Sequence, residues 1–432
     1  MLFENPYECY LYSYPHKTAY REFAEAISLT QAIDKRKRDE AHLYMHLPFC
    51  QSRCGYCNLF TTTGTFPDTY LPALRQHARA WQAAGVTKAF RFLSFAIGGG
   101  TPLLLTVEQL QELFDIAREH FFIDPARLPI SIETAPRQTT LDKIAVLKAN
   151  KVTRVSIGIQ SFHSQELEIL NRHHQPESAL KALELLAQAD FPVLNIDLIY
   201  GIPGQTHESF LSSLKQALLF APQEIFLYPL YIRPHTFLDL KGAANQQNQQ
   251  QTYTLYQTGR DYLIAEGYFQ TSMRRFTRVP ISCSTPEFSC SEENMISVGC
   301  GGRSYIGNLH FSEHYAVSQS HCQQILQDYI HRNHYAEVHY GYLLSEAELK
   351  RRFLIKNLLY YQGVDSSLYT ATYGTLAEED FPLLNTLCTE GLCTNNGRYW
   401  HLTSAGISYS DSIGAAFISE EVKQAMRQWK ES

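Results

Sequence analysis

The chain lacks three features that would have assigned it to a large class of proteins. It has no long apolar run, no Lys/Arg-rich run long enough to hold a polyanion, and no basic-then-apolar leader at its N-terminus. Its apolar runs fall well short of the ~20 residues that span a bilayer, and its formal net charge is −6. We therefore expect no membrane span and no nucleic-acid partner, and a location in the cytoplasm.

The cysteines also lack the density that is typical of a disulfide-bonded protein. Ten cysteines are spread over 432 residues, and three of them are clustered. This pattern fits a reducing compartment and a metal site better than a disulfide framework.

The clustered cysteines are Cys50, Cys54 and Cys57, in the run CQSRCGYC over residues 50–57. A cubane iron-sulfur cluster normally takes four thiolates, so a group of three leaves one iron free to bind another molecule. The alternative is a structural zinc site. Zinc sites usually add a second ligand pair, and no Cys or His follows Cys57 within fifteen residues. The spacing therefore favours an iron-sulfur cluster.

Between residues 42 and 232, short β-branched and aromatic runs alternate with amphipathic helical stretches. This alternation predicts an α/β fold, a partial (β/α)6 barrel that is open on one side. The expected strands are 42–49, 90–98, 128–134, 154–161, 192–201 and 224–232, and the expected helices are 106–120, 141–149, 176–189 and 207–219.

Four regions are expected along the chain. They are an N-terminal arm over 1–40, the barrel over 41–240, an α+β extension over 241–343 and a C-terminal winged-helix-like domain over 344–432. The arm is rich in tyrosine and shows little regular period; it is interpreted either as packing on the barrel surface or as a flap over the open side. In the last region we expect an acidic helix over 378–389, a cap at Gly391 and a hairpin that turns at residues 395–397.

Polar residues follow or end several of the predicted strands. The first strand leads into the cysteine loop, and the second ends in a glycine run at Gly98, Gly99 and Gly100. Active sites of barrels form at the carboxyl ends of parallel strands, and glycines let a backbone approach a ligand closely. Glu133, Gln160 and Asp197 come at the ends of the next three strands. Each alone could be a satisfied core polar group, but three at one mouth favour a shared polar ligand.

These motifs together resemble radical S-adenosylmethionine (SAM) enzymes, and more specifically the oxygen-independent coproporphyrinogen III oxidase family. That family's relatives include haem chaperones, anaerobic haem-degrading enzymes and class C radical SAM methylases. The resemblance covers about residues 40 to 310 and extends more weakly into the C-terminal domain.

The resemblance implies a [4Fe-4S] cluster held by Cys50, Cys54 and Cys57 and two molecules of SAM. It assigns the two SAM sites as follows: Tyr44, Tyr56, Gly99 and Glu133 to the SAM on the cluster, and Gly100, Thr101, Gln160, Arg172, Asp197 and Tyr231 to the second SAM. The expected reaction is SAM cleavage to a 5′-deoxyadenosyl radical that acts on an organic substrate, which the resemblance suggests is tetrapyrrole-like. The electron would come from a flavodoxin- or ferredoxin-type reductant.

Two departures leave the branch of the family open. The oxidases continue with a fourth cysteine after the third, whereas Asn58 and Leu59 follow Cys57 here, as in the chaperone and methylase branches. The N-terminal arm at residues 13–15 instead resembles the oxidases. Radical methyl transfer, oxidative decarboxylation and a non-catalytic role as a haem-binding chaperone therefore stay as alternatives.

Three further cysteines, Cys283, Cys290 and Cys300, have gaps that fit no common cluster spacing. We expect them to be free thiols. Cys290 lies in a polar stretch and is a candidate hydrogen-atom or proton donor in catalysis.

Overall fold

The computed structural model describes residues 2–11, 13–36, 38–279 and 294–431. Within these residues one 13-stranded sheet runs through the molecule in the order β1-β15-β14-β13-β12-β2-β5-β6-β7-β8-β9-β11-β10. Its centre consists of the six predicted strands, each parallel to the next. They are β2 (Glu40–Leu47), β5 (Arg91–Gly99), β6 (Ile130–Thr134), β7 (Arg154–Gln160), β8 (Val193–Tyr200) and β9 (Glu224–Pro229).

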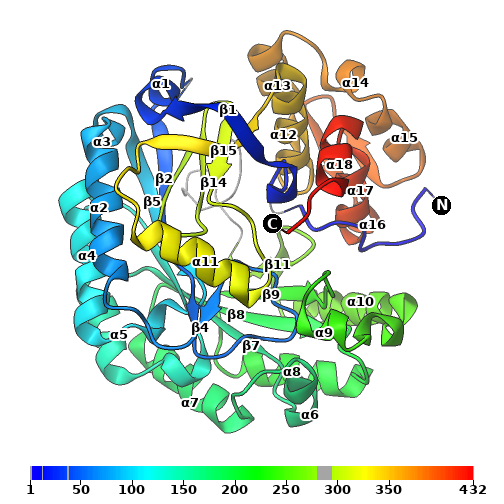
Figure 1. Ribbon diagram of the computed structural model, residues 1–432. Coiled ribbons are helices and arrows are strands. Elements are labelled where there is room, and N and C mark those ends of the chain that lie inside the picture. The colour runs from blue at the N-terminus through cyan, green and yellow to red at the C-terminus, as the bar shows by residue number, and fades with distance from the viewer. Residues whose placement is uncertain (1, 12, 37, 280–293, 432) are drawn as a thin grey trace.

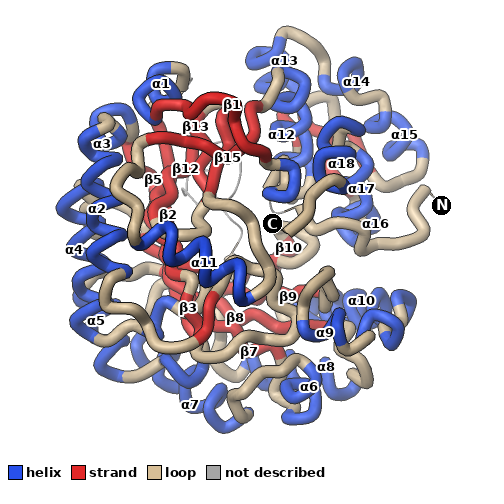
Figure 2. The backbone as a smooth tube through the Cα atoms, in the orientation of Figure 1, coloured by secondary structure: helices blue, strands red, loops and turns tan. Residues whose placement is uncertain are grey.

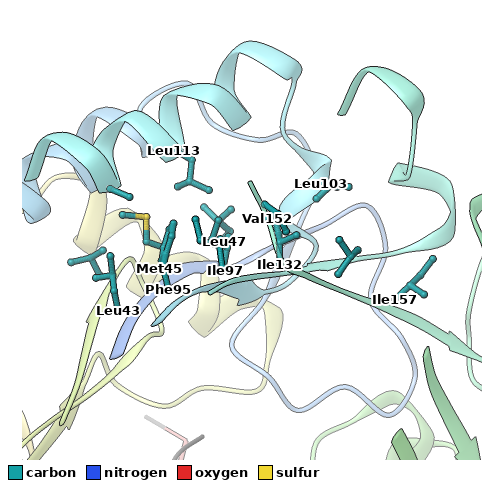
Figure 3. Packing of buried hydrophobic residues seen from close by; sticks show 14 of the residues in the cluster. Leu43, Met45, Leu47, Phe95, Ile97, Leu103, Leu113, Ile132, Val152 and Ile157 are labelled. Atoms are coloured by element: carbon teal, nitrogen blue, oxygen red, sulfur yellow. The ribbon is translucent and has the colours of Figure 1, made fainter. Parts of the chain in front are cut away.

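Helices cover the outer face of these strands, as Figures 1 and 2 show. The outer helices are α2 (Tyr70–Ala83), α3 (Val86–Ala89), α4 (Val107–Phe121), α5 (Leu141–Ala149), α6 (Ser164–Ile169), α7 (Pro176–Ala189), α8 (His207–Leu218) and α10 (Gln249–Ala265). Each main helix buries one apolar face on the sheet; in Figure 3, Leu113 of α4 lies over Phe95 and Ile97 of β5 and the neighbouring Met45 of β2. The α/β fold and the six parallel strands expected from the sequence are thus confirmed.

The sheet is wider than the six predicted strands. β12 (Asn294–Val298) pairs in parallel with β2 and adds a seventh parallel strand. The sequence pattern missed β12 because the strand has only five residues and all of them are buried, so it shows no alternation of polar and apolar side chains. On the far side of β12 lie the antiparallel β13 (Arg303–Ile306), β14 (Leu309–Ser312) and β15 (Glu337–Leu343), and at the opposite end β11 (Arg275–Thr277) and β10 (Phe269–Gln270) extend β9.

The N-terminal arm has more regular structure than its sequence indicated. It contains η1 (Lys17–Ala19), β1 (Arg21–Ser28) and α1 (Leu29–Asp34), and β1 forms one edge of the sheet by pairing with β15. A polar edge strand has a weak alternating pattern because little of it is buried. The residues before η1 run past the carboxyl ends of β8 and β9, where Tyr7 packs on Tyr200 with ring centroids 6.2 Å apart.

The last 90 residues form a helical domain around its own apolar cluster. Its helices are α12 (Glu346–Leu358), α13 (Ser366–Tyr373), α14 (Ala377–Asp380), α15 (Leu383–Thr389), α16 (Ser404–Ser408), α17 (Ser410–Ala416) and α18 (Glu420–Arg427). The predicted hairpin is present as β17 (Cys393–Asn395) and β18 (Tyr399–Leu402), to which β16 (Val364–Asp365) adds a third strand.

One prediction for this region was wrong. The acidic helix expected over 378–389 is two helices, α14 and α15. Pro382 has no N–H to continue the helix and disfavours a helical conformation at Phe381, which has φ −133° and ψ 75°. Gly391 adopts the expected left-handed conformation, with φ +71°, just beyond α15.

Among the helices that the structure describes, none combines the length and the apolar character that crossing a membrane requires.

Candidate cofactor site at the mouth of the barrel

The cysteine loop follows β2 and is fastened to the barrel at several points. Its first cysteine ends the short β3 (Phe49–Cys50), which pairs with β4 (Thr62–Thr63). Gly55 donates its N–H to the carbonyl of Leu170 at 2.8 Å, and the Asn171 side chain donates to the carbonyl of Arg53 at 3.1 Å. The loop is therefore held by the segment that follows α6.

The three thiols of this loop are free and half-buried. Arg172 donates from Nη1 to Sγ of Cys54 at 3.1 Å, and the hydroxyl of Thr101 lies 3.8 Å from Sγ of Cys50. Burial, followed by the nearness of Cys57, raises the pKa of Cys50 to about 12. Binding of iron by Cys50 would therefore displace a proton that its thiol otherwise holds.

The donor set fits an iron-sulfur cluster chemically, because three thiols lie on one short loop and the guanidinium of Arg172 contacts one of them. Among the described residues, no three His, Cys, Asp or Glu side chains are grouped closely enough to hold a metal ion. The thiolates of a four-iron cluster stand further apart than the ligands of a single ion.

The glycine run packs tightly against the protein's own atoms. A Cβ on Gly100 would lie 2.4 Å from the carbonyl oxygen of Phe49, and a Cβ on Gly99 would lie 2.8 Å from the ring of His46. Gly99 also has φ +116°, a conformation that side chains rarely adopt. Gly99 and Gly100 are therefore needed because any side chain at these positions would clash with the cysteine loop or the strand before it.

Glu133 faces the glycine run. Its carboxylate accepts the Gly99 N–H at 3.2 Å, and a Cβ on Gly98 would lie 3.0 Å from both this carboxylate and the hydroxyl of Tyr44. The side chain has accessible surface, yet the surrounding protein desolvates the charge and raises the pKa of Glu133 to about 7, with a smaller contribution from Asp197. A carboxylate in this state suits a ligand that brings a positive charge, as the ammonium of SAM does.

Gln160 and Asp197 lie on neighbouring strands. Gln160 has φ +72° at a bulge between β7 and β8, and its buried Oε1 accepts no hydrogen bond from the described residues. Backbone strain of this kind persists mostly at functional sites. Burial raises the pKa of Asp197 to about 6, while Asn195 donates to its Oδ1 at 2.7 Å and so opposes the rise.

Arg172 lies between the two groups of predicted contacts. Besides Cys54 it donates to the carbonyl of Gly158, and its buried Nε makes no hydrogen bond to the described residues. The two open positions, Gln160 Oε1 and Arg172 Nε, together provide an acceptor and a donor for a polar ligand. The sequence analysis predicted Arg172 as a SAM contact but did not predict its hydrogen bond to the thiol of Cys54.

Two predicted residues are in other surroundings. Tyr231 donates its hydroxyl to Asp411 and accepts from Arg274, so this hydroxyl is already engaged within the protein. Tyr56 lies beside Cys54 and packs against a small apolar cluster that includes Leu170. Cys290 and Cys283 lie outside the described residues. Cys300 is buried as a free thiol with a raised pKa, because burial disfavours its charged form.

Sequence reasoning missed two residues that meet behind the cysteine loop. His46 bridges the hydroxyl of Tyr44 (3.1 Å) and the carbonyl of Phe60 (3.2 Å), and burial lowers its pKa to about 3. Lys17 of the arm donates to the carbonyl of Gly301 at 2.6 Å, and burial lowers its pKa to about 7. The only signal for His46 was its place in the strand before Cys50.

Family models match two parts of the chain. The radical SAM superfamily matches residues 44–217, and the HemN C-terminal domain matches residues 344–409. Residues 44–217 thus match a radical SAM domain, which implies a [4Fe-4S] cluster and SAM, in agreement with the sequence-based prediction.

Curated relatives and a solved structure cover nearly the whole chain. The oxygen-independent coproporphyrinogen III oxidase of Escherichia coli (strain K12) is 28% identical over 92% of this chain and 91% of its own length. The heme chaperone HemW of Bacillus subtilis (strain 168) is 26% identical over 87% of this chain and 99% of its own length. The solved coproporphyrinogen III oxidase (HemN) from Escherichia coli superposes with a TM-score of 0.79 at 24% identity, covering 98% of both chains, and thus shows the same fold.

Proposed function

We propose that this protein is an enzyme that cleaves SAM reductively at a [4Fe-4S] cluster bound by Cys50, Cys54 and Cys57. The observation that carries the proposal is the convergence at one mouth of three free thiols, the desolvated Glu133 and the open polar atoms of Gln160 and Arg172. When bound, the reduced cluster supplies the electron that breaks a sulfonium carbon–sulfur bond of SAM and gives a 5′-deoxyadenosyl radical.

The protein's own residues bind and orient the reactants. Glu133 would hold the ammonium group of the first SAM, beside the glycine run and Tyr44, while Tyr56 would flank the cluster loop. Arg172, through its bond to Cys54, links the cluster loop to the second set of polar residues. That set comprises Gly100, Thr101, Gln160, Asp197 and Tyr231, and we propose that it contacts a second SAM. Gly100 is packed against Phe49, and the Tyr231 hydroxyl is engaged, so Gln160 and Asp197 provide the main polar contacts.

The proposed substrate is an organic molecule of the tetrapyrrole type, because the relatives of this chain are named for coproporphyrinogen III and heme. Two reactions suit the site: radical methyl transfer from the second SAM, or oxidative decarboxylation. Cys290 stays a candidate hydrogen-atom or proton donor, and a flavodoxin- or ferredoxin-type protein is the proposed reductant. We also retain as proposals the cytoplasmic location and the division of the chain at residues 40, 240 and 343.

A non-catalytic role as a haem-binding chaperone is the second candidate. It is favoured by the absence of a fourth cysteine after Cys57 and by relatives named heme chaperones. Tight stoichiometric haem binding without turnover of SAM would support it.

The decisive experiment is anaerobic reconstitution followed by incubation with dithionite and SAM. We expect about four irons and four sulfides per chain, an absorbance that dithionite bleaches, and slow formation of 5′-deoxyadenosine. S-adenosylhomocysteine alongside 5′-deoxyadenosine would indicate methyl transfer, whereas methionine as the sole companion would indicate oxidation. One equivalent of zinc in the native protein, or a cluster that never cleaves SAM, would contradict the proposal.

A further inference from the structure

The turn between β10 and β11, residues 271–274, contacts the C-terminal domain. Tyr361 donates its N–H to the carbonyl of Thr271 at 2.9 Å, and Ser272 forms a bridge with Tyr360. The next residue but one, Arg274, is buried, with 7% of its surface exposed. The segment therefore places a guanidinium between the barrel and the C-terminal domain.

Arg274 pairs with a carboxylate from the C-terminal domain. Its Nη2 donates to Oδ1 and Oδ2 of Asp411, at 2.6 and 2.7 Å, and Asp411 is only 2% exposed. The same carboxylate accepts the hydroxyl of Tyr231, which follows β9 at the barrel mouth. Removing one partner of a buried ion pair leaves the other charge uncompensated, which costs free energy. This cost holds Arg274 and Asp411 in contact.

The N-terminal arm is the third element of this assembly. The guanidinium of Arg274 lies 3.9 Å from the ring centroid of Tyr10, and the rings of Tyr10 and Tyr231 are stacked at 6.0 Å with an angle of 6°. A cation over an aromatic face is attracted by the ring, and more strongly when both are desolvated. Three segments that are far apart in sequence thus meet on one guanidinium.

This assembly reaches the predicted second SAM site. Tyr10 also contacts Tyr228, with ring centroids 6.4 Å apart. Asp197 on β8 lies opposite Phe226 on β9, and the ring of Phe226 stacks on that of Tyr228 with centroids 5.7 Å apart. Tyr10 and Tyr228 therefore connect the Arg274–Asp411 pair to the polar residues at the mouth.

We infer that Arg274 and Asp411 are positioning residues that clamp the N-terminal arm over the second SAM site. The C-terminal domain supplies the carboxylate, the barrel extension supplies the guanidinium, and the arm supplies the ring that both hold in place. These contacts alone support the docking of the arm. The effect of the arm on the binding of the second SAM rests on the proposed function.

The test uses full-length, anaerobically reconstituted protein and the variant Asp411→Asn, which keeps the shape of the side chain and removes its charge. We expect hydrogen exchange in the peptide covering residues 2–11 to become at least tenfold faster without SAM present. We also expect the second SAM to bind at least fivefold more weakly, while the electron paramagnetic resonance signal of the reduced cluster with its first SAM stays the same.

Two variants separate positioning from general stability. Asp380→Asn is the matched control: Asp380 accepts from Lys350 at 3.0 Å and from Tyr369 at 2.7 Å within the C-terminal domain, without touching the arm. It should destabilise that domain and leave exchange in residues 2–11 unchanged. Tyr10→Leu replaces the aromatic side chain by an aliphatic one and leaves the Arg274–Asp411 pair in place, and we expect it to reproduce both effects of Asp411→Asn even if that variant folds poorly.

Unchanged exchange of residues 2–11 in both Asp411→Asn and Tyr10→Leu would overturn the clamp. Faster exchange with only one SAM bound to the wild type would keep the clamp and remove the second SAM site of the proposed function.

Discussion

The two sides of the barrel mouth are built differently. On the side of the cysteine loop, the glycine run is pressed against the protein's own backbone, down to the 2.4 Å that a Cβ on Gly100 would leave to Phe49. On the side of β7 and β8, Gln160 and Arg172 keep buried polar atoms without partners among the described residues. The first side is organised by internal packing, and the second has polar capacity left for a ligand.

This difference separates two kinds of residue that sequence reasoning treats alike. A residue of the packed side shapes the loop that carries the thiols, so its substitution should affect stability as well as binding. A residue of the open side that makes no bond to the cysteine loop can be changed with little loss of packing, so its substitution should affect binding alone. The following predictions test that contrast.

Cys54→Ala should have the largest effect, because it removes one of three thiolates and the partner of Arg172. We expect the iron and sulfide content to fall to near zero, measured chemically after anaerobic reconstitution. Cys388→Ala, a half-buried free thiol in the C-terminal domain, is the control and should reconstitute fully. A complete, SAM-responsive cluster in Cys54→Ala would show that the loop does not bind it.

Gly100→Ala tests the packed side. The added methyl would meet the backbone of Phe49, and overpacking of this kind costs about 1–3 kcal/mol or more because backbone cannot swing away. Chemical denaturation and cluster content should both report the loss. Gly204→Ala is the control, since no atom lies within 4 Å of its Cβ position. Its left-handed φ alone should cost about 1 kcal/mol. Equal stability of the two variants would contradict the close packing of Gly100 against the backbone of Phe49.

Asp197→Ala tests the open side. We expect the second SAM to bind about tenfold more weakly, equivalent to about 1.4 kcal/mol, with cluster content and the first SAM unchanged. Equilibrium dialysis with labelled SAM measures both sites. Saturation at one SAM per cluster, with Asp197→Ala equal to the wild type, would contradict the two-SAM model.

Glu133→Gln should give the smallest effect, a pH-dependent change in the stability of the protein without cofactors. The native pKa of about 7 lies above the usual value of 4.5, so the native state holds the proton more tightly than the unfolded chain. The wild type therefore loses stability as pH rises from 4.5 towards 7, and the variant should not. Melting temperatures should converge below pH 4.5 and favour the variant at pH 8; a gap independent of pH would contradict the raised pKa.

The sequence predicted the parts of the fold that follow a repeating pattern. The six parallel strands and helices such as α5 and α7 were predicted because apolar spacing reports burial on a sheet. β12 was missed because it is short and buried throughout, and β1 was missed because it is a polar edge strand. The single helix predicted over residues 378–389 is divided into α14 and α15 at Pro382, because the spacing of acidic and apolar residues does not take the proline into account.

For the site, the sequence indicated residue types at strand ends but not their partners. It predicted ligand contacts for Arg172 and Tyr231. The structure adds the bond of Arg172 to Cys54 and the pairing of Tyr231 with Asp411, which join residues 118 and 180 positions apart. His46 and Arg274 were missed as functional candidates for the same reason: their roles depend on tertiary neighbours, which periodicity does not report.

The pairing of β1 with β15 has a consequence for how the protein is made. Arg21 lies opposite Gly341 in that pair, so the N-terminal strand waits for most of the chain to leave the ribosome before it finds its place. The cysteine loop and its anchor at Leu170 are complete much earlier. Because residues 50–170 are synthesised before Gly341, the cysteine loop can reach its anchor before β1 has a strand to pair with.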